Sequence, residues 1–120
     1  MQLHGTKYSE RSKMTNTQIV NKALCIRYPF VKPRDIENYD YSFTILDFMP
    51  TMWYIKFGRE LLESIREVYI AMPKEMQDDF YITEIKEKYG ELRIYFSIYN
   101  EDTDRIANFY REESKNVPLV

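Results

Sequence analysis

A regular spacing of apolar residues near the N-terminus predicts the first helix. Apolar side chains recur every three or four residues between Thr15 and Pro29, which indicates a helix over 16–27. Thr15 or Asn16 can cap its first turn with a side-chain oxygen. Pro29 ends it, because the residue before a proline is disfavoured in the α conformation. The residues expected on its buried face are Ile19, Val20, Ala23, Leu24 and Tyr28.

The longest helical pattern covers about 54–72 and ends at Pro73. Its apolar residues repeat every three or four positions, and charged residues cover the opposite face, as in a helix that packs on a core. Gly58 falls within the apolar stripe, although glycine costs ~1 kcal/mol relative to alanine inside a helix. We therefore expect close packing or a kink at Gly58. The other members of the stripe are Tyr54, Leu61, Leu62, Ile65, Val68, Tyr69 and Met72.

Alternating apolar and polar residues over about 80–99 predict an antiparallel β-hairpin, in which Gly90 supplies the positive φ of the turn. A slip of one residue would move every apolar side chain to the other face. We therefore expect the register that keeps one face dry, with a four-residue loop over 88–91. That register pairs Glu87 with Leu92, Ile85 with Ile94 and Thr83 with Phe96, and it places Lys86 across from Arg93 and Glu84 across from Tyr95.

A last helix begins at a cap formed by Asn100 or Asp102 and extends to about residue 115, with Ile106, Phe109 and Tyr110 facing inward.

The elements together predict an α+β protein. The proline-punctuated connector over 28–50 contains one alternating stretch, which indicates a short third strand near 41–47. We expect a single domain over 15–120, in which the hairpin packs against two to three helices. Residues 1–14 show no hydrophobic period and are interpreted as a flexible tail.

The residue types of common catalytic sites are scarce in this chain. There is one histidine, His4, and one cysteine, Cys25, so Ser-His-Asp, Cys-His and HExxH sites and cysteine-based zinc clusters lack the residues they need. The three glycines are too far apart for a phosphate-binding loop. We therefore expect no enzyme, no metal site and no cofactor. Cys25 is expected to be a small buried hydrophobe rather than a nucleophile.

Acidic residues are common, and two groups of them have simple structural explanations. Asp78 and Asp79 are expected in an exposed turn before the hairpin rather than in a metal site. Glu101, Asp102 and Asp104 stand at the start of the last helix, where negative charge is favourable.

Charge is distributed unevenly along the chain. Residues 1–34 carry seven Lys or Arg and one acidic residue, whereas residues 35–120 carry ten Lys or Arg and eighteen acidic residues. The acidic remainder argues against a nucleic-acid partner, so the basic region is interpreted as a solvated tail and helix face. No apolar run approaches the ~20 residues that span a bilayer. The N-terminal sequence also lacks an apolar signal segment, which predicts a cytoplasmic protein with no membrane partner.

Aromatic side chains gather in residues 39–57, where seven of nineteen positions are aromatic. Two interpretations remain open: the segment is core only, or it is core and interface together, since aromatic residues and methionine anchor protein interfaces. The partner-binding residues expected under the second interpretation are Tyr39, Tyr41, Phe48, Met52, Trp53 and Tyr54, with Tyr95 and Tyr99 on the outer hairpin face as a secondary patch.

The alternative function uses that outer face of the hairpin. Lys86 and Arg93, next to Tyr95 and Tyr99, would bind a small ligand, a nucleotide or a nucleic acid.

The hairpin sequence IKEKYGELRIY over 85–95 resembles the IKEKFGGLRFY hairpin of many small bacteriophage proteins. In that family a Tyr-Pro step ends an early helix, as Tyr28-Pro29 does here, and a Gly-Trp step opens a long helix where this chain has Met52-Trp53. The resemblance covers about 16–116. Glu91 replaces the second glycine of the turn, and the cysteine-containing tail of the family, which resembles a zinc site, is absent, so no metal role carries over.

In its length and phage character the chain also resembles phage-encoded anti-defence proteins that bind a bacterial defence-associated sirtuin. The resemblance implies that this host enzyme destroys NAD when it senses a phage structural protein, and that the bound inhibitor blocks its activation or activity. It therefore predicts a non-enzymatic inhibitor in the host bacterial cytoplasm, whose partner is a sirtuin-domain NADase.

Overall fold

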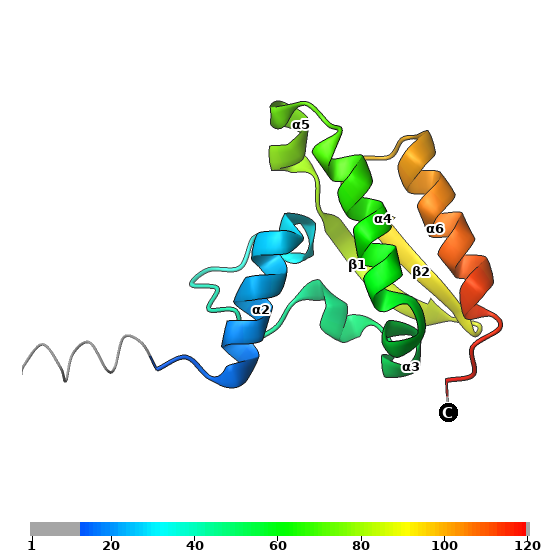
Figure 1. Cartoon of the computed structure of the whole chain (residues 1–120), viewed down its shortest axis with the longest axis horizontal. Helices are drawn as coiled ribbons and strands as arrows, with labels where there is room; N and C mark the ends of the chain where they lie inside the picture. The colour runs from blue at the N-terminus through cyan, green and yellow to red at the C-terminus, as the bar shows by residue number, and fades with distance from the viewer. Residues whose placement is uncertain (1–12, 120) are drawn as a thin grey trace, which may run out of the picture.

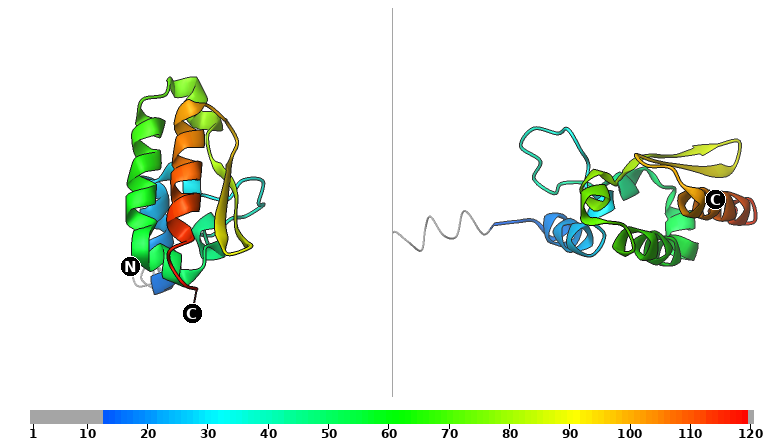
Figure 2. Two further views of the ribbon diagram at one scale, coloured as in Figure 1. Left: turned by 90° about the vertical axis from the view of Figure 1, so that its right-hand side faces the viewer. Right: turned by 90° about the horizontal axis from the view of Figure 1, so that it is seen from above.

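Helices α2, α4 and α6 lie side by side with α4 in the middle, and a two-stranded hairpin covers one face of the α4–α6 pair (Figure 1, Figure 2). The structure is a computed structural model that describes residues 13–119, and the α+β class expected from the sequence is confirmed. Nearly all of the tail predicted over 1–14 lies outside these residues. The elements in chain order are α2 (Asn16–Arg27), η1 (Pro29–Val31), η2 (Ile45–Phe48), α3 (Thr51–Trp53), η3 (Tyr54–Gly58), α4 (Arg59–Ile70), α5 (Lys74–Asp79), β1 (Ile82–Lys88), β2 (Glu91–Phe96) and α6 (Glu101–Ser114).

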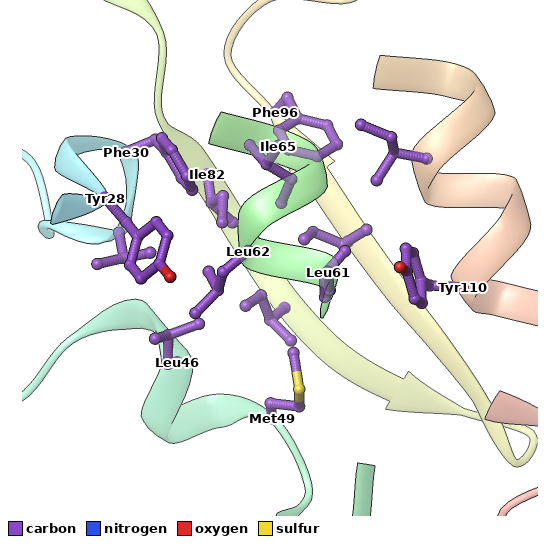
Figure 3. Packing of buried hydrophobic residues seen from close by; sticks show 14 of the residues in the cluster. Tyr28, Phe30, Leu46, Met49, Leu61, Leu62, Ile65, Ile82, Phe96 and Tyr110 are labelled. Carbon is purple, nitrogen blue, oxygen red and sulfur yellow. The ribbon is translucent and has the colours of Figure 1, made fainter. Parts of the chain in front are cut away.

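The core is centred on α4, which contributes side chains in two directions. Leu61 points toward Tyr110 of α6, whereas Leu62 points toward Leu46 of η2 (Figure 3). Ile65 is fully buried over the hairpin. A cluster of rings closes one end of this core, with centroids 5.6–6.3 Å apart between Phe30, Tyr69, Phe80 and Phe96. Helices α4 and α6 therefore cover the apolar face of the hairpin, as the sequence predicts.

The hairpin has the predicted register for most of its length. Ile85 pairs with Ile94 and Lys86 with Arg93, but Phe96 pairs with Ile82 rather than with Thr83. A bulge at Thr83 causes this difference, because one extra residue reverses the side-chain alternation and turns Ile82 into the core. The loop has two residues rather than four, since Lys88 already pairs with Glu91. Tyr89 and Gly90 both have positive φ, at 56° and 79°, as a type I′ turn requires.

Helix α2 has the predicted bounds, but a different face of it is buried. Asn21 and Cys25 face the core, and the Asn21 amide is satisfied there because it donates to the Tyr41 carbonyl at 2.9 Å. The expected face was assigned from apolar spacing, which does not show which side finds a neighbour. Of its members, Tyr28 is buried, Leu24 is half-buried, and Ile19, Val20 and Ala23 are exposed.

The third strand predicted near 41–47 is wrong. The segment forms a bend followed by the 3₁₀ turn η2. Thr44 caps this turn, since its hydroxyl accepts the Leu46 N–H at 3.1 Å and its own N–H donates to the Asp47 carboxylate at 3.2 Å. Side chains that satisfy the local backbone in this way compete with strand pairing, and alternation alone does not reveal them.

Two details near the C-terminal half also differ from the prediction. Asp78 and Asp79 end a short helix, α5, instead of lying in a turn, and a helix of this length is too short to show a period. Helix α6 is capped by Asn100 as expected, but Phe109 lies on its exposed side. The buried side of α6 consists of Thr103, Ile106, Tyr110 and Ser114.

Candidate protein-binding groove

An apolar groove runs between α2 and η3, with a volume of about 520 Å³. Val20, Leu24 and Tyr54 also line an adjoining hollow of about 290 Å³, which extends the groove toward Met49 and Thr51. We call this combined feature the α2–η3 groove. Its main apolar walls are Ile19, Val20, Ala23 and Leu24 on α2, and Tyr54 and Leu62 on the opposite side.

The α2 wall of the groove is largely open to solvent. Ile19 is 53% exposed and Val20 is 57% exposed. Scattered exposed apolar residues are ordinary, but a contiguous apolar hollow marks a site that binds a ligand or a protein. The groove is therefore the part of the described surface best suited to bind an apolar group.

The opposite wall depends on a turn of π-helix. The helix that begins at Thr51 widens over η3 before it continues as α4. Gly58 lies directly below the Tyr54 ring, and a Cβ atom there would be 2.7 Å from Tyr54 Cδ1. The close packing expected at Gly58 is therefore confirmed, and it holds the Tyr54 ring against the groove. Such π turns are rare and are frequent at functional sites.

Polar contacts between α2 and α4 fix the width of the groove. The Arg27 guanidinium donates two hydrogen bonds to the Glu63 carboxylate, both at 3.0 Å, and the Tyr28 hydroxyl donates to the same carboxylate. Arg66 Nε donates to the Arg27 carbonyl at 3.2 Å. The hydrogen bonds from Arg27 lower the pKa of Glu63 and raise that of Arg27, so both stay charged near neutral pH. A groove with fixed walls loses little conformational entropy on binding.

The connector before η2 holds α2 from its other side. The Gln18 amide donates to the Asp40 carbonyl at 3.0 Å, close to the contact between Asn21 and Tyr41. Tyr39 and Tyr41 pack edge to face with centroids 5.0 Å apart. The two rings, both candidates for partner binding, are half-buried and tied into this connector.

Tyr39 also covers the single cysteine. Cys25 is buried as expected, and burial raises the pKa of its thiol despite the Tyr39 hydroxyl beside it. Burial likewise raises the pKa of Tyr39, whose hydroxyl donates to the Phe43 carbonyl. A buried thiol with a raised pKa is a poor nucleophile.

Trp53 is not available to a partner in this structure. It is 0% exposed, and its Nε1 donates to the Val117 carbonyl at 3.1 Å, so it joins the helix start to the C-terminal segment. The expectation that Trp53 lies at an interface is therefore wrong, because its large ring is part of the core.

The other candidates on the same segment are exposed. Phe48 is 58% exposed, and Met52 and Tyr54 are exposed to a lesser degree. Tyr54 lines the groove itself, and Phe48 and Met52 lie next to Met49 and Thr51, which line its extension. These three residues keep their predicted place as candidates for partner binding.

The outer face of the hairpin brings the predicted ligand-binding residues together, and each of the two cations pairs with an acidic residue. Lys86 lies 5.6 Å from the Tyr95 ring centroid and 3.6 Å from the Glu84 carboxylate. Arg93 pairs with Glu91 at 3.0 Å. Glu91 also contacts Arg111 and Lys115, so these acids offset only part of the positive charge of the face.

The same face includes the most highly bonded carboxylate of the hairpin. Arg111 of α6 approaches Glu91 to 2.7 Å, and this hydrogen bond is the main reason that the pKa of Glu91 is lowered. Tyr99, the second aromatic candidate here, is exposed and lies beyond the end of β2.

Sequence reasoning missed the α2 wall of the groove, because Ile19, Val20 and Ala23 were assigned to the core. One signal could have found it: helix α2 is only weakly amphipathic, so its apolar spacing does not single out one buried face.

Within residues 13–119, no three His, Cys, Asp or Glu side chains lie close enough together to hold a metal ion. No helix in this range is both long enough and apolar enough to cross a membrane. The chain matches no protein family model, no curated protein and no solved structure.

Proposed function

We propose that this chain is a phage-encoded, non-catalytic anti-defence protein that binds a bacterial defence-associated sirtuin and blocks its NADase activation or activity. The observation that carries the proposal is the preformed apolar groove, which Val20 and Tyr54 line from opposite sides. The class of partner comes from the resemblance of the hairpin and of the chain length to phage proteins.

The groove supports binding of a protein rather than a small polar ligand. Its main hollow is lined mostly by apolar side chains, and Arg27 and Arg59 also line it. Binding energy at protein interfaces comes mainly from a few desolvated apolar and aromatic side chains. Tyr54 combines an apolar ring with a hydroxyl, so it suits this role.

Inhibition follows if the complex favours an inactive state of the enzyme. A ligand shifts a conformational equilibrium only by its difference in affinity for the two states. The chain would therefore bind the resting sirtuin more tightly than the activated one, without any chemical step of its own.

The experiment measures NAD consumption by a purified defence-associated sirtuin that is activated by a phage structural protein. The chain should suppress consumption at a stoichiometry that matches complex formation. Val20→Glu should weaken inhibition about tenfold or more, because it places a charge in the apolar groove. Ile26→Glu is the matched control, since Ile26 is also exposed on α2 but does not line the groove. An inactive wild-type chain, or equal inhibition by both variants, would contradict the proposal.

A further inference from the structure

Two exposed cations, Lys56 and Arg59, lie beside the main hollow of the α2–η3 groove, which no described Asp or Glu lines. Lys56 and Arg59 belong to the η3 side, where they flank Tyr54 and Ile55. Neither cation forms an ion pair with any residue in the described part of the chain. Both are exposed, so an incoming partner can reach them.

The acidic residues of the same wall are already engaged. Glu63 is held by Arg27 at 3.0 Å. Glu60 accepts the Tyr110 hydroxyl at 2.8 Å, which directs it toward α6. Asp47, which lines the groove extension, accepts the Thr44 N–H and has no ion-pair partner among the described residues, so the positive character belongs to the main hollow.

Helix α2 and its neighbours carry an excess of positive charge, although Arg27 is the only cation among them that lines the groove. Residues 13–34 contain five Lys or Arg and no Asp or Glu. A surface of one sign attracts partners of the opposite sign and speeds their encounter. The acidic residues of the chain all follow this region, apart from Glu10.

We infer that the α2–η3 groove binds an acidic amphipathic helix of the partner protein. This inference rests on the proposed function as a binding protein. The α2 wall of the groove extends from Ile19 to Arg27. At the rise of an α-helix this length is about 12 Å, which matches about two turns of a bound helix. The bound helix would place apolar residues at i, i+3 or i+4, and i+7 against Val20 and Tyr54, with carboxylates facing Lys56 and Arg59.

Charge disfavours the two other candidate occupants. A second copy of the chain would bring its own cationic α2 against this one, because a two-fold interface uses the same patch twice. The N-terminal segment 1–12 carries Lys7 and Arg11 but only one acidic residue, Glu10, so its net charge is positive, as are Lys56 and Arg59 beside the groove.

The test selects peptides from a random displayed library against the full-length chain, with depletion on the Val20→Glu variant. We expect enriched sequences that repeat apolar residues every three or four positions and carry a net negative charge. Their affinity should fall about tenfold when Lys56 and Arg59 are both changed to Glu, equivalent to ~1.4 kcal/mol. Lys74→Glu is the control, because Lys74 does not line the groove and lies on α5, at the opposite end of α4 from α3 (Figure 1).

This selection does not use the sirtuin, so it separates the inference from the proposed inhibition. Enrichment of neutral or basic sequences, or of none that depend on Val20, would overturn the inference even if the chain inhibits the enzyme. A dimer that Val20→Glu dissociates in sedimentation would instead identify a second copy as the occupant. A nitroxide on Ser9→Cys that broadens the Val20 amide signal would identify the N-terminal segment.

Discussion

Replacing Gly58 with alanine tests whether the π turn and the Tyr54 ring form one unit. The new Cβ would lie 2.7 Å from Tyr54 Cδ1 and 3.0 Å from Cγ. Because Cγ is the root of the ring, the contact cannot be relieved by a small movement of the ring tip. Tyr54 must therefore adopt another rotamer and leave the groove wall.

Two opposing effects set the size of the change. Alanine in place of glycine stabilises a helix by ~1 kcal/mol. Displacing the Tyr54 ring exposes on the order of 100 Å² of apolar surface, which costs ~2.5 kcal/mol at ~25 cal/mol per Å². Gly58→Ala should therefore lower the free energy of unfolding by ~1–2 kcal/mol. In a Tyr54→Ala background the clash is absent, so Gly58→Ala should raise the free energy of unfolding by up to ~1 kcal/mol.

Urea unfolding followed by tryptophan fluorescence measures this double-mutant cycle. The single tryptophan, Trp53, is fully buried next to η3, so its emission reports the folded state of this region. A coupling of ~2–3 kcal/mol between positions 54 and 58 is expected. If Gly58→Ala alone stabilises the wild-type chain, the Tyr54 ring does not lie against Gly58 and the reasoning is refuted.

Three further predictions concern the core, the acid limit of stability and the aromatic segment. Ile94→Ala should cost ~2–5 kcal/mol in urea unfolding because Ile94 is buried on the hairpin, and a cost below ~1 kcal/mol would contradict the packing. The hydrogen bonds from Arg27 hold the pKa of Glu63 below its usual 4.5. The ion pair of Glu63 with Arg27 therefore stabilises the fold above pH 4.5, and this stabilisation is lost as the pH falls through the lowered pKa. Glu63→Gln should flatten the decline of melting temperature between about pH 5 and 3. An unchanged decline would show that this pair does not set the acid limit. Phe48→Ala should change unfolding by less than ~0.5 kcal/mol and Tyr39→Ala by ~1–3 kcal/mol, and equal losses would show that Phe48 is core.

The sequence predicted the fold best in segments where one hydrophobic period continues over many residues. The stripe around Ile65 predicted α4, and the alternation around Ile94 predicted the hairpin and most of its register. The bulge at Thr83 was missed because an inserted residue looks like a continued alternation until the partner strand is placed.

The candidate site was only partly predictable for a related reason. The aromatic richness of 39–57 drew attention to Tyr54 and Phe48, which are exposed, but it could not separate them from Trp53, which is buried. The α2 wall was missed because tertiary contacts, among them the hydrogen bond from Asn21 to the Tyr41 carbonyl, orient that helix. Such a tertiary hydrogen bond is invisible to a hydrophobic period.

Hydrogen–deuterium exchange of the chain, free and bound to the sirtuin, tests the central claim most directly. Slower exchange on binding should be confined to α2 around Val20 and to η3 around Tyr54, which line the groove. The outer hairpin face around Lys86 and Arg93 should exchange at an unchanged rate. Protection of the hairpin face with no change at α2 and η3 would contradict the account, because the partner would then bind the outer face of the hairpin and not the groove.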